Sequence, residues 1–173
     1  MENQPTVSRK SIMINYGILT AVATIAIGVV NYAFGDIYEP HWSINVISYI
    51  VMIAITVLGI KKFKDANSGL LSVGDSIKIG LGISAIAALI GMLYMYVFAT
   101  FIEPDFINNV AEVQRVKMLE DNPNIPEATL ETTEKMTREY FYPFAFGFVI
   151  LINLFFGFMT GLIAGLVMKK SEM

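Results

Sequence analysis

The chain has 173 residues, of which 55% are hydrophobic and 16% charged, and its formal net charge is −3. Its mean hydropathy of +0.59 is well above the usual range of water-soluble domains, which excludes a globular protein that keeps its apolar side chains away from lipid. Because the chain has no cysteine, disulfides, thiolate catalysis, iron–sulfur clusters and cysteine-ligated zinc are excluded as well.

Four apolar runs of bilayer-spanning length follow one another along the chain. A helix needs about 20 apolar residues to cross a hydrocarbon core roughly 30 Å thick, and none of the runs contains a charged residue. The sequence therefore predicts an all-α integral membrane protein, a single membrane domain over residues 1–173, with four transmembrane helices. The runs are Ile12–Phe34, Trp42–Ile60, Ile79–Phe101 and Phe144–Met168, and the corresponding spans are predicted at about 12–34, 42–60, 77–101 and 140–168.

The first run also has some features of a secretory signal, because Arg9 and Lys10 precede it and the small residues Ala33 and Gly35 lie at its end. The apolar part of a signal peptide spans about 7–15 residues. Ile12–Phe34 is longer, and three more spans follow it. We therefore interpret this run as an uncleaved first helix.

The distribution of Lys and Arg between the connecting segments predicts the orientation of the spans. Positively charged residues in short loops and tails gather on the cytoplasmic side of a membrane protein. Eight of the twelve lie on the side of the two termini, and the other four lie in the long loop before the last span, which also carries nine acids. Both termini are therefore predicted to be cytoplasmic, in a bacterial inner membrane. The eight are Arg9, Lys10, Lys61, Lys62, Lys64, Lys78, Lys169 and Lys170; the four are Arg115, Lys117, Lys135 and Arg138.

The long outer loop, residues 102–139, is predicted to form a helical hairpin. Pro104 and Asp105 are suited to a helix start, and an apolar stripe then recurs at helical spacing until residues 121–124 (Asp-Asn-Pro-Asn) end the helix. A second helix is expected to begin near Pro126 and to continue into the fourth span, with a kink at Pro143. The stripe consists of Phe106, Val110, Val113 and Val116.

Two spans carry small residues at a four-residue period, which places them on one helix face. Such faces let two helix backbones approach closely, and in lipid this close contact replaces the hydrophobic drive that packs helices in water. The pattern leaves open whether the faces pack within one chain or against a partner or second copy. The fourth span carries Gly157, Gly161 and Gly165, and the third carries Gly80, Ser84 and Ala88.

Asn153 is a strongly polar side chain near the middle of the fourth span. An unsatisfied amide is costly in hydrocarbon. We expect an interhelical hydrogen bond to a backbone carbonyl or to a hydroxyl such as that of Thr24 or Ser84, with a substrate or ion contact as the alternative.

Several outer-loop side chains have oxygen or imidazole donors suited to a hard cation, if the two outer connections are neighbours. They are weak metal candidates, because acids at membrane edges are common and no recognised ligand spacing is present. No nucleophile motif, phosphate loop or intramembrane acid appears either, so we expect no metal, no cofactor and no enzymatic activity. The candidates are Asp36, Glu39, His41, Glu103 and Asp105.

The segment 69–80 (GLLSVGDSIKIG), the outer exit 101–106 (FIEPDF) and the long acidic loop before a Phe- and Gly-rich last span together resemble a known family. The chain resembles the Bacteroidota membrane proteins of domain-of-unknown-function family 4199 over nearly its whole length. The resemblance implies no catalytic residues. It implies polyprenyl-phosphate glycosyltransferases as a class of partner.

We interpret the chain as a non-enzymatic accessory or scaffold subunit of the inner membrane that packs against a partner membrane protein through its small-residue faces and outer hairpin. The alternative is a small homo-oligomeric transporter or channel with Asn153 facing a shared path. A third possibility is a membrane enzyme or accessory of lipid-linked glycosyl transfer. The expected partners are membrane lipid and another membrane protein or a second copy of the chain; no nucleic-acid partner is expected.

The predicted topology is testable by labelling, because the chain has no cysteine of its own. A cysteine introduced at Ser68 and one introduced at Asn122 should react with impermeant reagents from opposite sides of the membrane, with Asn122 accessible from outside. Labelling of both positions from the same side would contradict the four-span topology.

Overall fold

A computed structural model describes residues 8–170 of the chain. Its described residues form five α-helices and one π-helical turn. Four long segments are apolar enough to span a membrane, which confirms the predicted all-α membrane fold. The elements are α1 (Arg9–Phe34), α2 (Trp42–Ala66), α3 (Val73–Val97), η1 (Phe98–Ile102), α4 (Phe106–Asp121) and α5 (Glu127–Met168).

Serine side chains cap the helices at the end of the molecule where the chain begins and ends. The Ser8 hydroxyl accepts a hydrogen bond from the Ser11 N–H at 3.1 Å, and the Ser72 hydroxyl accepts one from the Asp75 N–H at 3.0 Å. These bonds satisfy N–H groups that a helix start otherwise leaves without a partner. The Arg9 guanidinium forms an ion pair with the Asp75 carboxylate at 2.6 Å, so the starts of α1 and α3 are joined.

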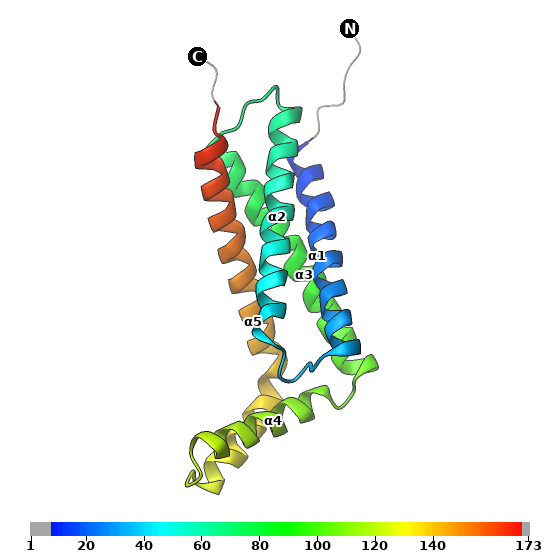
Figure 1. Ribbon diagram of the computed structural model, residues 1–173, viewed down its shortest axis with the longest axis vertical. Coiled ribbons are helices and arrows are strands. Elements are labelled where there is room, and N and C mark those ends of the chain that lie inside the picture. Colours follow the sequence, from blue (N-terminus) through cyan, green and yellow to red (C-terminus); the bar gives the residue numbers. More distant parts are fainter. Residues whose placement is uncertain (1–7, 171–173) are drawn as a thin grey trace.

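The four spans form a bundle in which α3 packs against α1 and α5, while α2 packs across from α3 against the same two helices (Figure 1). The core lies toward the end with the termini, around residues such as Ile60, Ile79 and Ile83, all 0% exposed. A short antiparallel bridge between Leu71 and Lys170, with both N···O distances at 3.0 Å, joins the α2–α3 loop to the end of α5. The bundle is therefore closed tightly at this end.

The closest helix contact is between the small-residue faces of α3 and α5. A Cβ atom added to Gly80 would lie 2.3 Å from the Gly157 carbonyl oxygen, and one added to Gly161 would lie 2.8 Å from the Ile77 Cα. Real Cβ atoms do not approach backbone so closely, so no side chain fits at these positions unless the helices separate. In this structure the predicted small-residue faces therefore pack against each other within one chain. We call this contact the glycine seam.

The remaining members of the two faces are buried as well. A Cβ atom on Gly157 or Gly165 would meet the side chain of Ser84 or Ser76, respectively, and Ala88 is only 2% exposed. The hydroxyls of Ser76 and Ser84 are buried without a hydrogen-bond partner among residues 8–170. Their small size, rather than a hydrogen bond across the seam, is what they contribute to the contact.

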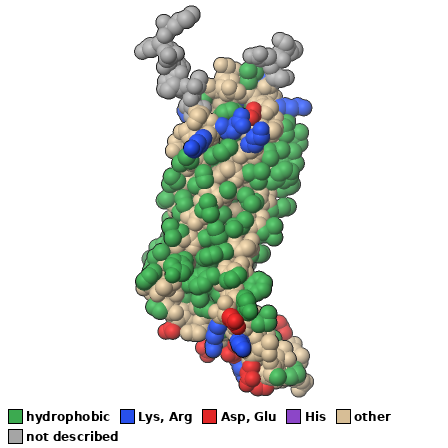
Figure 2. Space-filling view, turned by 180° about the vertical axis from the view of Figure 1, so that it is seen from behind, with side chains coloured by type: hydrophobic (Ala, Val, Ile, Leu, Met, Phe, Trp, Pro, Cys, Tyr) green, Lys and Arg blue, Asp and Glu red, His purple; other side chains and the backbone are tan. Residues whose placement is uncertain are grey.

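Beyond the bundle, α4 and the first part of α5 form the predicted hairpin, and α5 is continuous from Glu127 to Met168 with Pro143 inside it. Figure 1 shows α5 leaving the bundle and changing direction to run beside α4. A proline removes one backbone hydrogen bond and crowds the preceding turn, which is the usual cause of such a bend. Figure 2 shows Lys and Arg at the end with the termini, and mixed charges on the hairpin.

The apolar stripe predicted on α4 is correct only in part. Phe106, Val110 and Val113 are partly buried, but Val116 is 49% exposed. The residue of α4 that is buried most completely is Ala111, at 1% exposure. Val116 is exposed because it lies about 80° around α4 from Phe106 and about 140° from Ala111, outside the buried arc between these two residues.

The glycine seam makes a specific stability prediction. Gly161→Leu should lower the free energy of unfolding in detergent by roughly 1–3 kcal/mol or more, because the new side chain meets the backbone of α3 and must push the helices apart. A thermal melt in mild detergent measures this effect.

Ile163→Leu is the matched control, since Ile163 is 56% exposed and the exchange conserves side-chain volume. It should leave the melting temperature nearly unchanged. An unaltered melt for Gly161→Leu would show that α3 and α5 do not pack as described.

Candidate functional site

The outer hairpin has a small apolar core of its own. Ala111 on α4 and Leu130 on α5 are each 1% exposed, although both lie outside the bundle. Above them, Phe106 at the start of α4 contacts rings from three other segments, with centroid distances of 5.5 Å to Phe98, 5.7 Å to Tyr38 and 5.8 Å to Phe141. Phe106 therefore joins the hairpin to the first outer loop and to the end of α3.

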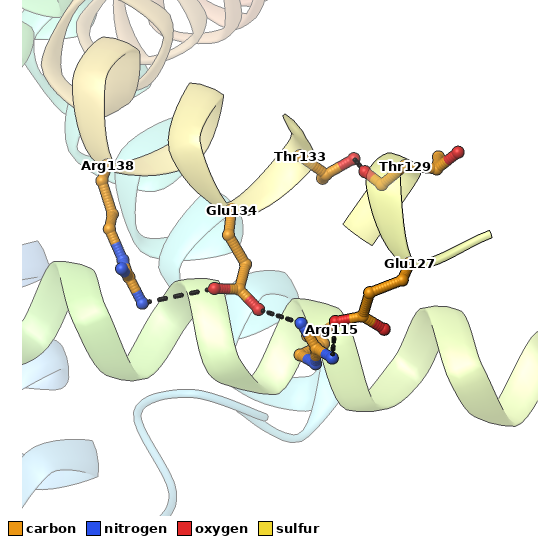
Figure 3. Close-up of polar contacts among 6 residues, drawn as sticks. All are labelled: Arg115, Glu127, Thr129, Thr133, Glu134 and Arg138. Atoms are coloured by element: carbon orange, nitrogen blue, oxygen red, sulfur yellow. Dashed lines mark hydrogen bonds and ion pairs between the residues drawn. The ribbon is translucent and has the colours of Figure 1, made fainter. Parts of the chain in front are cut away.

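A charged network holds the two helices of the hairpin together (Figure 3). The Arg115 guanidinium on α4 donates to Glu127 at 2.6 Å and to Glu134 at 2.9 Å, both on α5. The second oxygen of Glu134 accepts from Arg138 at 3.4 Å. The two acids are seven residues apart, which places them on the same face of α5, two turns from each other. One arginine thus bridges two turns of the opposite helix.

These contacts also fix the charge of the arginine. Hydrogen bonds to Glu127 and then to Glu134 raise the pKa of Arg115 above its usual value. The guanidinium therefore stays protonated at any physiological pH. Its chemical role is to hold the hairpin together.

A second tie between the hairpin helices lies nearer the membrane. The Thr137 hydroxyl on α5 donates to the Gln114 side-chain oxygen on α4 at 2.6 Å. Beside it are two adjoining hollows of about 370 and 350 Å³, which share Gln114, Thr137 and Phe144 in their walls. We call them together the hairpin groove.

Exposed apolar side chains line one edge of the hairpin groove. Met136, Tyr140 and Phe144 follow one another at four-residue spacing on α5 and are 49%, 45% and 68% exposed. This spacing puts them on one helix face. A continuous apolar strip therefore runs from the outer hairpin toward the membrane, next to a hollow and within a segment that is rich in acids.

The two outer connections of the chain are tied to each other. Glu39 in the first connection forms an ion pair with Lys117 on α4 at 3.1 Å, and the Asn109 amide donates to the Tyr38 hydroxyl at 2.8 Å. Between the outer ends of α1, α2 and α3 there is also an open cleft of about 370 Å³, whose polar lining includes Asn31 and Asn45.

The structure does not bring the predicted cation ligands together into one group. Asp36 accepts from the backbone N–H groups that follow it, Glu103 accepts from the Tyr32 hydroxyl at 3.0 Å, and Glu39 pairs with Lys117. His41 contacts the Ser43 hydroxyl at 2.8 Å. Asp105 directly precedes α4 without a capping side-chain bond. Within residues 8–170, no three acidic or histidine side chains are close enough to hold one metal ion.

The prediction that Asn153 bonds to a neighbouring helix is wrong. Its side-chain N–H donates to the carbonyl oxygen of Val149, one turn back in the same helix, at 2.9 Å. The Thr24 hydroxyl is likewise bonded within its own helix, to the carbonyls of Thr20 and Ala21. An amide in a span can use its own helix because the side chain reaches the carbonyl four residues earlier, so sequence spacing alone does not imply a partner helix.

A family model described as a protein of unknown function (DUF4199) matches residues 15–170, from the first span to the end of the last. The chain belongs to this family. No curated protein and no solved structure matches the chain.

The charged network of this DUF4199 protein was not anticipated from the sequence. The available signal was the spacing of Glu127 and Glu134 on one face of a predicted helix, opposite a lone Arg115 in the preceding helix. The apolar strip on the hairpin was missed because Met136 and Tyr140 follow the same helical period as the span itself. They looked like a continuation of the membrane helix.

The network predicts that the charge of Arg115 keeps the two hairpin helices of the DUF4199 protein together. Arg115→Gln removes the group that joins both acids of α5 to α4, so amide hydrogen exchange in α4 should become several-fold faster while exchange in α3 stays unchanged.

The control for this variant is Lys135→Gln, which removes the same charge from the same hairpin. Lys135 makes no ion pair with any residue in the described part of the chain. Equal effects of the two substitutions would mean that net charge, and not the Arg115 contacts, governs the stability of the hairpin.

Proposed function

We propose that the protein is a non-enzymatic accessory subunit of a bacterial inner membrane that binds a partner membrane protein through its outer hairpin. The observation that carries the proposal is the apolar strip of Met136, Tyr140 and Phe144 beside the hairpin groove. Large apolar side chains at the centre of a patch with a charged surround are typical of protein–protein contacts.

The rigidity of the hairpin supports a binding role. Its two helices are joined by the Arg115 network and by the Gln114–Thr137 bond, and Phe106 joins them to the bundle. A surface held in place before binding loses less conformational entropy when a partner docks. The strip is therefore presented in a fixed direction relative to the membrane.

The small-residue faces are not part of this proposal, although the sequence offered them as a docking surface. Gly80, Gly157 and Gly161 already contact the opposing helix of the same chain. In the proposed function these residues hold α5 in place, and α5 carries the docking surface at the membrane edge, where the span continues into the hairpin.

Orientation completes the proposal: both termini are cytoplasmic and the hairpin faces the outside. It is supported by the bias of eight Lys and Arg against four between the two ends of the molecule. Two sets of polar side chains in the hairpin bond to one another, which supports a structural role for them: Arg115 with Glu127 and Glu134, and Thr137 with Gln114.

A second candidate function is a homo-oligomeric transporter. The open outer cleft favours it, because Asn31 and Asn45 give that cleft a polar lining at the level of the spans. In this arrangement the cleft is the entrance to a path that several copies complete.

Site-specific photo-crosslinking in cells tests the proposed function. A benzoylphenylalanine in place of Met136 should form a defined adduct with one foreign membrane protein, and the adduct should weaken when Tyr140→Ser is added, because the neighbouring part of the strip is lost.

The control position is Leu58, which is 55% exposed on α2 and lies toward the end of the bundle that holds the termini, away from the hairpin. It should yield no such adduct. Adducts only between copies of this chain at Met136 would favour the homo-oligomer instead, and the absence of any protein adduct at Met136 would contradict both functions.

A further inference from the structure

An apolar groove of about 420 Å³ lies between α2 and α5, on the opposite half of the bundle from the hairpin. Ile53 and Val57 line it on α2, and Phe156, Ile163 and Val167 are among the residues that line it on α5. The stacked rings of Tyr49 and Phe156, 4.5 Å apart, lie at its outer end. From there the groove extends toward the end of the molecule that holds the termini.

The length of the groove matches one hydrocarbon chain of a lipid in one leaflet. Its α5 wall from Phe156 to Met168 is about 18 Å long at 1.5 Å per residue, close to the depth of one leaflet of a core roughly 30 Å thick.

Lysines follow the groove-lining segments of α2 and α5 along the chain, toward the end of the bundle that holds the termini. Lys61 and Lys64 follow Val57 by four and seven residues on α2, which places them on the helix face that lines the groove. Lys169 and Lys170 directly follow the end of α5. None of these four forms an ion pair with an acid within residues 8–170.

The backbone bridge between Leu71 and Lys170 fixes the last residues of α5 beside the α2–α3 loop. The lysines that follow α5 are therefore held at the same end of the bundle as those of α2. Long lysine side chains extend along apolar surface and place their ammonium groups at the level of lipid headgroups.

We infer that this lysine-capped groove is a binding site for one anionic phospholipid of the leaflet on the side of the termini. An acyl chain occupies the groove between α2 and α5, and the headgroup phosphate lies against the ammonium groups of Lys61 and Lys64. The apolar lining selects a hydrocarbon chain, and the lysines select a negative headgroup. The inference does not depend on the proposed function of the hairpin.

Fluorescence quenching by brominated lipids tests the site, because Trp42 is the only tryptophan and lies at the other end of α2. In a Trp42→Phe background, Val167→Trp places a single indole at the groove, at a position that is 79% exposed. A second reporter, Leu89→Trp, lies on α3 at a position that is 62% exposed and samples bulk lipid. Both are reconstituted with brominated phosphatidylglycerol or brominated phosphatidylcholine.

From quenching at Val167→Trp, the binding constant of phosphatidylglycerol relative to that of phosphatidylcholine should be about fivefold or more. This is the factor expected from one lysine near an anionic surface. The Leu89→Trp reporter should show a preference close to one. Lys61→Gln combined with Lys64→Gln should reduce the preference at Val167→Trp to that of the bulk reporter.

The matched control is Lys62→Gln combined with Lys78→Gln, which removes the same charge at this end of the bundle. Lys62 lies about 140° around α2 from Val57 and Lys78 lies on α3, so the preference should survive. Equal losses in the two double variants, or equal quenching by the two lipids at Val167→Trp, would overturn the inference. A third result would also overturn the inference: at Val167→Trp, neither lipid quenches the indole until the protein is diluted in the membrane. A second copy of the chain would then occupy the groove.

Discussion

The close approach of the α3 and α5 backbones at Gly80, Gly157 and Gly161 is the contact on which the rest of the structure depends. Lipid tails are as apolar as leucine side chains, so burial of apolar surface does not by itself join two helices in a membrane. Two helix backbones in direct contact gain dispersion energy, and they reach that contact only where no side chain holds them apart. The seam therefore sets the position of α5 in the membrane. Because the same helix continues into the hairpin, the seam also sets where the hairpin begins.

Because α5 is one continuous helix from Glu127 to Met168, the seam and the hairpin are mechanically connected. Inside the membrane, α5 contacts α3 through glycines that match the backbone of α3. Outside it, α5 is joined to α4 through Arg115 and the two acids it bridges, together with the Gln114–Thr137 bond. Each environment thus uses the interaction that is effective there. The glycine seam therefore fixes the direction in which the hairpin groove faces, and the Arg115 network fixes the shape of the groove.

Much of the fold follows from local sequence rules. Uncharged apolar runs predict the four spans, and the prolines and the Asp-Asn-Pro-Asn segment predict the hairpin and the continuity of α5, which the structure confirms. These features are predictable because they depend on neighbours along the chain. The partner of a small-residue face is not local, and the sequence left open whether Gly161 faces its own chain or another.

The parts of the site that were missed depend on how helices face each other. Val116 follows the period of the α4 stripe, yet it is exposed because the buried face of α4 is centred nearer Ala111 than the stripe is. Asn153 was expected to need a neighbouring helix, yet it bonds to its own backbone at Val149. The Arg115 bridge forms only if α5 is oriented about its axis so that Glu127 and Glu134 face α4. Residue spacing along one helix does not predict that orientation.

A cysteine pair across the seam tests the central claim most directly, in a chain without native cysteines. A Cβ atom on Gly165 would lie 2.9 Å from the Ser76 Cβ, so a small outward shift brings the pair into the roughly 3.5–4.5 Å range of a disulfide. Ser76→Cys combined with Gly165→Cys should form, on mild oxidation in the membrane, a disulfide within one chain that migrates as a monomer. A disulfide-linked dimer from the same pair, with no link within the monomer, would show that the seam joins two chains and would contradict this account.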